Sequence, residues 1–341
     1  MKKKVLILGF GGTIAMVPDK NGVLRPAKSI EEILAIVPTL REMADVTVKQ
    51  IINLDSTNLN HHHWVTLIDA IIADYDKYDG ILVTHGTDTM SYTACAVSFA
   101  FGRGLKKPIV FTGSQLPLIE YGTDARFNLE NALRVLVEAS IKNIAEVMIV
   151  FSDKILRGNR SIKTSESKFT AFDSPAIPNI GIITATGVSF SPLVLKVDQS
   201  VKSEIKKNFS EGVLAIELYP GIQPEVIMPS LKSGKCKALL LKSLGAGNVP
   251  SEGDYSFIPL IKYATEEMNI PVLVSTKFTG GNTHMEIYEP GKLALEAGAI
   301  PTGDLTDVAA QVKCMWALDV WEKSKEEFKK IISQDIVGEK S

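Results

Sequence analysis

Hydroxyl and carboxylate side chains gather in four short segments in the first third of the chain. The segments read GFGGT, DSTN, HGTDT and TGSQ, at residues 9–13, 55–58, 85–89 and 112–115. Threonine and serine hydroxyls can attack a carbonyl carbon, carboxylates bind ammonium groups, and backbone amides beside glycine can stabilise an oxyanion. Any one segment alone could be ordinary turn or helix-cap chemistry. The four together form a candidate site.

Each of the four segments follows a predicted strand. A short apolar run ending in glycine predicts a buried strand at 5–9, and further strands are predicted at 46–52, 80–84, 108–112 and 146–151. Between them, apolar residues recur at helical spacing and predict helices over 29–37, 64–75, 94–101 and 128–140. This alternation predicts a mostly parallel sheet covered by helices, in which the loops after the strands converge. We therefore expect the four segments to meet at one edge of the sheet.

A second alternating set begins after residue 212 and predicts another α/β domain. Its predicted strands are 213–218, 238–241 and 272–276, with helices from 224, around 261–268, over 290–297 and over roughly 306–320. Between about 177 and 210 the pattern loosens into short β-like pieces and a charged stretch. We therefore predict an α/β fold of two domains. The larger, at 1–190, carries the catalytic loops, and a linker at 191–212 leads to a smaller C-terminal domain at 213–341.

The composition excludes several classes of protein. Lys and Arg number 37 against 39 Asp and Glu, so the net charge of −2 offers no general footprint for nucleic acid or an anionic membrane. No stretch approaches the roughly 20 apolar residues of a membrane span. Cys95, Cys236 and Cys314 are odd in number and far apart, which favours a reducing compartment over a disulfide framework. The first apolar run is too short for a signal peptide, so we expect a cytoplasmic protein.

Two cofactor interpretations fail on their own criteria. Gly9 and Gly11 would open a dinucleotide-binding G-x-G-x-x-G motif, but Ile14 stands at the third glycine position. No acidic residue ends the second predicted strand at the distance that such a site requires. The run His61–His63 suggests a metal, yet consecutive histidines diverge and no matched carboxylate or cysteine spacing accompanies them. We therefore expect neither a metal nor an organic cofactor.

Three motifs together carry a family resemblance. GGTIA at 11–15, Asp55-Ser56 and HGTDTM at 85–90 resemble the signature segments of the bacterial-type L-asparaginase family, in its cytoplasmic type I branch. TGSQLP at 112–117, the RGNR segment followed by Lys163, and LALEAGAIPTGDLT at 293–306 support the resemblance, which covers the whole chain. It implies hydrolysis of L-asparagine to L-aspartate and ammonia, without a cofactor. It also implies a homodimer or a dimer of dimers, with the site near the subunit interface.

The resemblance also implies roles for individual residues. Thr13 matches the nucleophile, and Thr87, Asp88 and Lys163 match the polar relay that accompanies it. Asp88 is similar to the carboxylate that holds the substrate's α-ammonium group, and Ser56 to the hydroxyl that binds its α-carboxylate. The remaining residues expected to line the substrate are Asp55, Thr57, Gly86 and Ser114. With Asp88 alongside, we expect Lys163 to share a proton rather than to act as a simple neutral amine. His85 is expected to be structural.

One position departs from the family pattern. Val23 stands where a loop tyrosine that helps to deprotonate the nucleophile is expected, and valine cannot move a proton. Either Lys163 activates Thr13 through Thr87, or another group such as Tyr121 enters, or activity is weak. L-glutamine is an alternative substrate, because one methylene changes binding by only about 1–3 kcal/mol. The alternatives to an asparaginase are a glutaminase-type subunit of a tRNA amidotransferase, which should carry an extra N-terminal domain, and an amino-acid-binding regulatory protein.

Overall fold

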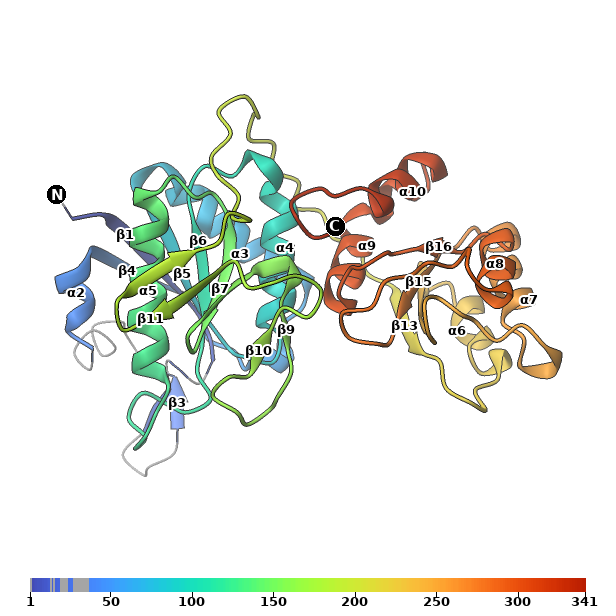
Figure 1. Ribbon diagram of the computed structural model, residues 1–341, viewed down its shortest axis with the longest axis horizontal. Helices are drawn as coiled ribbons and strands as arrows, with labels where there is room; N and C mark the ends of the chain where they lie inside the picture. Colours follow the sequence, from blue (N-terminus) through green and yellow to red (C-terminus); the bar gives the residue numbers. More distant parts are fainter. Residues whose placement is uncertain (1, 13, 15, 19–23, 27–36) are drawn as a thin grey trace. The chain divides into compact units, whose positions relative to one another are not determined.

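An eight-stranded sheet forms the centre of the first part of the chain (Figure 1). The computed structural model describes residues 2–12, 14, 16–18, 24–26 and 37–341, which fall into two units, Met1–Lys207 and Asn208–Ser341. The strands of the first unit lie in the order β12-β11-β8-β7-β6-β5-β1-β4. Their bounds are β1 Lys4–Phe10, β4 Asp45–Ile52, β5 Gly80–His85, β6 Ile109–Thr112, β7 Val147–Phe151, β8 Lys154–Arg157, β11 Gly181–Thr184 and β12 Gly187–Phe190.

The sheet is mixed but mostly parallel. Strands β4, β1, β5, β6 and β7 run parallel, as the sequence predicts, whereas β8, β11 and β12 are antiparallel to their neighbours. Strands β11 and β12 lie in the stretch of short β-like pieces predicted at about 177–210, whereas β8 and the antiparallel direction were not predicted. Only Ser152 and Asp153 separate β7 from β8, and only Ala185 and Thr186 separate β11 from β12, and so short a connection can only turn the chain back. The predicted α/β class, with its mostly parallel N-terminal sheet, is confirmed.

Helices cover both faces of this sheet. Helices α2 (Thr39–Met43) and α5 (Ala125–Ile141) pack on one face, and α3 (His61–Asp74) and α4 (Met90–Phe101) on the other. Successive strand side chains point to opposite faces, so Val5 of β1 joins the core beneath α5. Helix α4 is buried at nearly every position, because a 3-10 turn at Gly158–Arg160 packs against its other side. The helix predicted at 29–37 lies almost entirely outside the described residues.

Two small hairpins accompany the large sheet. One joins β2 (Met16–Pro18) to β3 (Leu24–Pro26), and the other joins β9 (Ile162–Lys163) to β10 (Phe172–Asp173). The second hairpin follows β8 and the 3-10 turn, and it was not predicted. Because its strands are two residues long, their position depends on contacts outside the pair.

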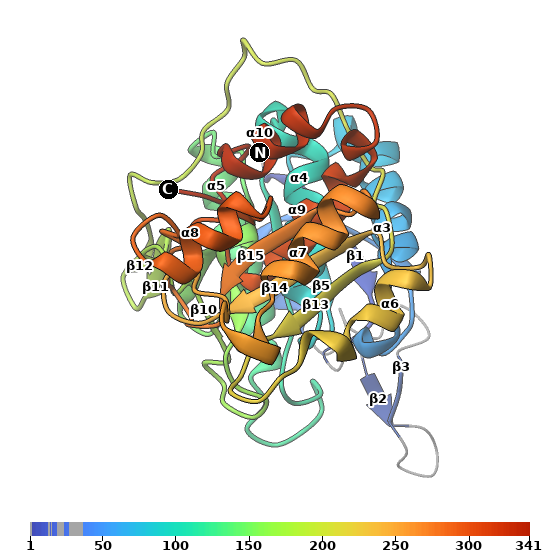
Figure 2. The ribbon, with the colours of Figure 1, turned by 90° about the vertical axis from the view of Figure 1, so that its right-hand side faces the viewer.

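Four parallel strands form the sheet of the second unit, in the order β13-β14-β15-β16. Helices cover the face of this sheet that is turned toward the viewer in Figure 2, and others complete the unit. The strands are β13 Val213–Glu217, β14 Ala238–Ser243, β15 Val272–Thr276 and β16 Ile300–Pro301. The helices are α6 Met228–Lys232, α7 Ile258–Lys262 and α8 Glu289–Glu296 on that face, with α9 Asp307–Trp321 and α10 Lys325–Ser333. The predicted C-terminal α/β domain is confirmed in its class.

An ion pair lies inside the second unit. The ammonium of Lys313, on α9, is 2.5 Å from a carboxylate oxygen of Glu339, and both side chains are 0% exposed. Lys313 also donates to the carbonyl of Gln334 at 2.5 Å, and the Glu339 carboxylate accepts the backbone amides of Ile336 and Val337. The opposite charge and these hydrogen bonds together offset the cost of burying the two charged groups.

None of the helices within the described ranges is both long and apolar enough to cross a bilayer.

Candidate active site

The four polar segments follow four adjacent strands. In the order β6-β5-β1-β4 the strands are neighbours, and all run in the same direction. Their carboxyl ends therefore lie along one continuous stretch of the sheet edge. The loops that leave these ends begin at Gly113, Gly86, Gly11 and Asn53. A parallel sheet binds ligands at this edge, because loops and helix N-termini meet there.

Glycine allows three of these loops to approach one another closely. A Cβ on Gly12, whose φ is +92°, would stand 2.4 Å from the backbone nitrogen of Gly86. A Cβ on Gly86 would in turn stand 2.6 Å from the hydroxyl oxygen of Ser56. No real side chain makes contacts this short, so both positions need glycine. The loops that precede Thr13, Thr57 and Thr87 are thus held against one another.

The predicted nucleophile lies outside the described residues, and so does the position of the missing tyrosine. Thr13 is flanked by Gly12, which contacts Gly86, and by Ile14, which is buried. Val23 falls within a longer gap. The side chain of Tyr121 is fully exposed in the turn between β6 and α5. Its role in activating the nucleophile stays a prediction.

Lys163 joins two of the expected site residues. Its ammonium donates to the hydroxyl of Thr87 at 2.8 Å and to Oδ1 of Asp88 at 2.7 Å. The Lys163 side chain is 16% exposed and that of Asp88 55% exposed, so the amine is mostly covered while the carboxylate faces solvent. Thr87 and Asp88 lie just before α4, and Lys163 reaches them from β9, 75 residues away from Asp88 in sequence.

The loop after β4 contributes a capped turn. The carboxylate of Asp55 accepts the backbone amide of Thr57 at 2.9 Å and also its hydroxyl, and these bonds lower the pKa of Asp55. Asp55 therefore caps the 3-10 turn Ser56–Asn58. Ser56 itself is buried, and its carbonyl accepts the hydroxyl of Thr89 at 2.8 Å. This bond ties the loop after β4 to the loop after β5.

His85 holds the backbone of the loop after β5. Its Nδ1 is 2.7 Å from the carbonyl of Gly86, and its Nε2 is 2.8 Å from the hydroxyl of Thr93. A carbonyl can only accept, so Nδ1 carries the hydrogen and Nε2 accepts from Thr93. Complete burial lowers the pKa of His85 to about 4, against a smaller opposing effect of the Gly86 carbonyl. The ring is therefore neutral at neutral pH and orients the loop.

The loop after β6 is held by a carboxylate that is not among the predicted site residues. Asp124 accepts the backbone amides of Gln115 and Leu116, at 3.0 and 3.1 Å, and the side-chain amide of Asn128 at 3.0 Å. Buried Ser114 donates to the carbonyl of Leu116 at 2.6 Å. Asp124 stands directly before the observed helix α5, but the helix was predicted only from residue 128, so no helix-start signal pointed to this position.

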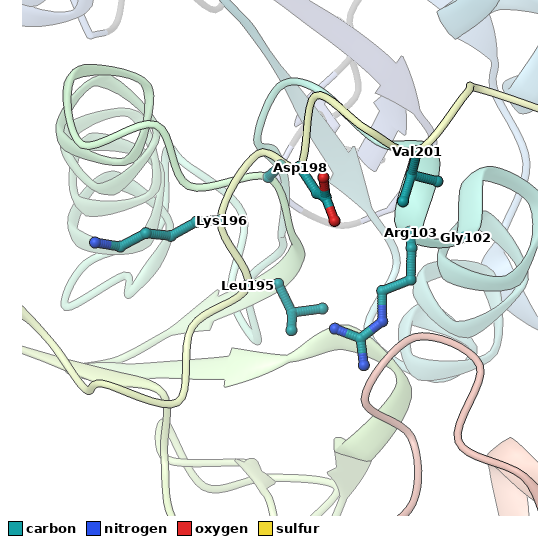
Figure 3. Close-up of a pocket in the computed structure, with 7 residues that line it drawn as sticks. Gly102, Arg103, Leu195, Lys196, Asp198 and Val201 are labelled. Atoms are coloured by element: carbon teal, nitrogen blue, oxygen red, sulfur yellow. The ribbon is translucent and has the colours of Figure 1, made fainter.

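A pocket of about 350 Å³ lies at the opposite edge of the sheet, near the amino ends of β6 and β7 (Figure 3). The side chain of Lys196 points away from it, and the carboxylate of Asp198 accepts the amide and hydroxyl of Ser200. Burial raises the pKa of the Glu146 carboxylate, although its ion-pair partner Arg157 and, more weakly, Arg103 lower it. Because these groups serve the chain itself, we assign no ligand to this pocket. Its lining residues are Gly102, Arg103, Ala145, Leu195, Lys196, Asp198 and Val201.

The three consecutive histidines form the start of a helix. Asn60 caps α3 by accepting the amide of His62 at 3.1 Å, and Nδ1 of His63 accepts the amide of Asn60 at 3.0 Å. Such reciprocal bonds satisfy amides at a helix start that have no partner within the helix. Within the described ranges, no three His, Cys, Asp or Glu side chains are grouped to hold a metal ion.

Comparison with known proteins follows the division into two units. The family model described as "Asparaginase, N-terminal" matches residues 4–193, and the one described as "Glutaminase/Asparaginase C-terminal domain" matches residues 212–332. An L-asparaginase of Thermococcus kodakarensis is 36% identical over 339 residues, covering 98% of each chain. The structure of L-asparaginase I from Vibrio cholerae superposes with a TM-score of 0.88 at 33% identity, covering 100% of both chains.

Two further relatives bear on location and on the alternative function. A structure described as a probable cytoplasmic L-asparaginase, from Campylobacter jejuni, superposes with a TM-score of 0.81 at 27% identity, covering 98% of this chain and 100% of that one. A glutamyl-tRNA(Gln) amidotransferase polypeptide from Pyrococcus abyssi is 32% identical over 346 residues. That match takes in 98% of this chain but only 76% of the amidotransferase polypeptide. The family matches and the full-length relatives agree with the motifs at the sheet edge: the chain belongs to the asparaginase family.

Proposed function

We propose that this protein is an amidohydrolase that converts L-asparagine to L-aspartate and ammonia. The observation that carries the proposal is the bonding of Lys163 to both Thr87 and Asp88, at the sheet edge where Gly12 meets Gly86. A hydroxyl nucleophile requires a route for its proton, and an amine between a hydroxyl and a carboxylate can supply one. The L-asparaginases similar to this chain over its full length support the choice of substrate.

The proposed reaction passes through a threonyl ester. The hydroxyl oxygen of Thr13 attacks the side-chain amide carbon of asparagine and gives its proton to Thr87, while Thr87 gives one to Lys163 and the Lys163 ammonium gives one to the Asp88 carboxylate. The C–N bond then breaks, and ammonia leaves after taking up a proton from this relay. Water next attacks the acyl-enzyme, so that aspartate is released and the Thr13 hydroxyl is restored. Thr87 can serve in this relay because a hydroxyl both donates and accepts, and its oxygen lies 2.8 Å from the Lys163 amine.

Recognition of the amino-acid end of the substrate falls to the loops after β4 and β5. Lys163 engages Oδ1 of Asp88, and the exposed remainder of that carboxylate can bind the α-ammonium group of the substrate. The hydroxyl of Ser56 is proposed to bind the α-carboxylate. The other residues proposed to line the substrate are Asp55, Thr57, Gly86 and Ser114.

Release of ammonia tests the proposal. Purified protein is assayed with L-asparagine and with L-glutamine, beside Thr13→Ala and the control Thr186→Ala, which changes an exposed threonine on the turn between β11 and β12. We expect saturable turnover of asparagine that Thr13→Ala lowers by at least about a thousandfold, with unchanged thermal unfolding, because a nucleophile has no substitute. Thr186→Ala should match the wild type.

The alternatives give different outcomes in the same assay. A glutaminase unit, which the similarity to the amidotransferase polypeptide favours, would turn over glutamine faster than asparagine. An amino-acid-binding regulatory protein would bind aspartate saturably and release no ammonia above buffer. Activity retained in Thr13→Ala would remove Thr13 from the role of nucleophile.

We also propose a homodimer or a homotetramer in the cytoplasm, with a small-molecule substrate and neither nucleic acid nor membrane as a partner. The near-neutral charge supports the absence of a nucleic-acid partner. The Campylobacter jejuni relative supports the location.

A further inference from the structure

The hairpin that carries Lys163 has few hydrogen bonds of its own to stabilise it. Its strands pair through only two residues each, Lys163 with Phe172 and Ile162 with Asp173. The amide of Thr164 donates to the carbonyl of Ala171 at 2.7 Å, and the turn between them is exposed. So short a two-stranded pair is marginal in water. The position of the Lys163 amine therefore depends on how the turn is fastened.

One side chain outside the hairpin fastens this turn. The side-chain amide of Gln115 donates to the carbonyl of Glu166 at 3.1 Å and to the carbonyl of Lys168 at 3.0 Å. An amide NH₂ group has two hydrogens, so both donors of Gln115 are used on the same turn. The acceptors are backbone groups, so the bonds depend on the residue at 115 and not on the side chains at 166 and 168.

Gln115 is itself fixed to the sheet. The carboxylate of Asp124 accepts its backbone amide at 3.0 Å, and Asn128 of α5 donates to that carboxylate and to the carbonyl of Gly113, each at 3.0 Å. Asp124 and Asn128 are buried. The Gln115 side chain therefore extends from a rigid base to an exposed turn.

We propose that Gln115 is a positioning residue, which holds the 164–171 turn against the sheet edge and thereby keeps the Lys163 amine on Thr87 and Asp88. The kinetic part of this inference rests on the proposed function, whereas the structural part does not. Misplacing a catalytic group by about 1 Å can lower a rate about a hundredfold. The donor at 115 thus sets the turnover rate without touching the substrate.

Hydrogen exchange tests the structural part without any need for activity. Gln115→Ala removes the donors, and Gln115→Glu keeps the shape but turns an acceptor toward two carbonyls, so it should loosen the turn at least as much. We expect faster exchange over residues 162–173, including the amide of Thr164, in both variants. The matched control is Gln50→Glu, because Gln50 also donates its side-chain amide to two carbonyls, those of Gly9 and Ile52, but on β4. Hairpin exchange unchanged by Gln115→Ala, or accelerated equally by Gln50→Glu, would overturn the proposal.

Kinetics test the consequence for Lys163. We expect Gln115→Glu to lower kcat about tenfold to a hundredfold with KM changed less than about threefold, because Asp88 and Ser56 remain in place. Gln199→Glu, an exposed change of the same charge, should leave both constants unchanged. In a Lys163→Met background, Gln115→Ala should cause no further loss.

The outcomes separate the two proposals. Losses that add in the double variant, or an unchanged kcat beside a loosened hairpin, would overturn the positioning role while the amidohydrolase proposal stands. If the wild-type protein released no ammonia, the proposed function would be wrong. The exchange experiment would still decide whether Gln115 fastens the turn.

Discussion

The amine of Lys163 serves two acceptors of different kinds. Asp88 is a carboxylate and stabilises the charged ammonium, whereas Thr87 is a hydroxyl that accepts one of its hydrogens. When a proton arrives from the nucleophile, the hydrogens of the Thr87–Lys163 and Lys163–Asp88 hydrogen bonds can therefore shift one step toward Asp88. The same carboxylate is also proposed to bind the substrate's ammonium group, so substrate binding and proton transfer meet at a single residue.

Stability should depend on pH through His85. Burial lowers its pKa to about 4, whereas the unfolded chain protonates histidine near 6.5. Between these values the unfolded chain binds more protons than the folded one. The free energy of unfolding should therefore fall as the pH falls from 6.5 to 4, by up to about 1.4 kcal/mol per pH unit from this group.

Urea unfolding of the wild type and of His85→Asn at several pH values between 7 and 4 measures this dependence. Asparagine keeps a donor near the carbonyl of Gly86 but does not titrate. The variant should lose the part of the slope that His85 supplies, while carboxylates elsewhere contribute equally to both proteins. Identical slopes would show that His85 is not held neutral in the folded state.

At the scale of elements, the sheet edge depends on contacts between loops that side chains would prevent. A Cβ on Gly86 would stand 2.6 Å from both the Cβ and the hydroxyl oxygen of Ser56, so Gly86→Ala must displace Ser56. We expect Gly86→Ala to lower the free energy of unfolding by about 1–3 kcal/mol, as for other overpacked sites, and to raise KM.

A compensating change tests this explanation. Ser56→Gly combined with Gly86→Ala removes the clash, so thermal unfolding should return toward the wild-type temperature. KM should stay high, because the hydroxyl proposed to bind the α-carboxylate is lost. A double variant no more stable than Gly86→Ala would place the strain elsewhere, for example against Gly12.

How much of this could be read from the sequence differs between elements. Four of the five parallel strands, β1, β5, β6 and β7, are buried apolar runs in the sequence, and so the edge that carries Thr87 could be predicted. Strand β8 and the hairpin at Lys163 could not, because they are only two to four residues long. Strands β11 and β12 could be predicted only as short β-like pieces without a direction. Resemblance alone pointed to Lys163, since nothing local shows that it returns to a helix start 75 residues earlier. The hydrogen bonds from the Gln115 side chain could not be predicted either, because they end on backbone carbonyl groups, which every residue has.

At the scale of the whole molecule, each unit has a core of its own, and that of the second unit includes two charges. Removing one partner of a buried ion pair typically costs about 3–5 kcal/mol, because the other charge stays buried alone. We expect Lys313→Met to lower the free energy of unfolding of the second unit by this amount. Lys313→Met combined with Glu339→Leu should recover much of the loss. Calorimetry that resolves the two units measures both, and equal stability of Lys313→Met and the wild type would contradict the expectation.

This ion pair also bears on how the protein is made. Glu339 follows Lys313 by 26 residues, so during translation α9 leaves the ribosome before its counter-ion does. Until the residues around 339 emerge, folding of the second unit would bury the Lys313 ammonium without its counter-ion. The nascent segment is therefore expected to stay unfolded until then. A premature stop codon between positions 313 and 339 would therefore yield a chain whose second unit does not fold stably, and such a chain is a substrate for cellular proteases.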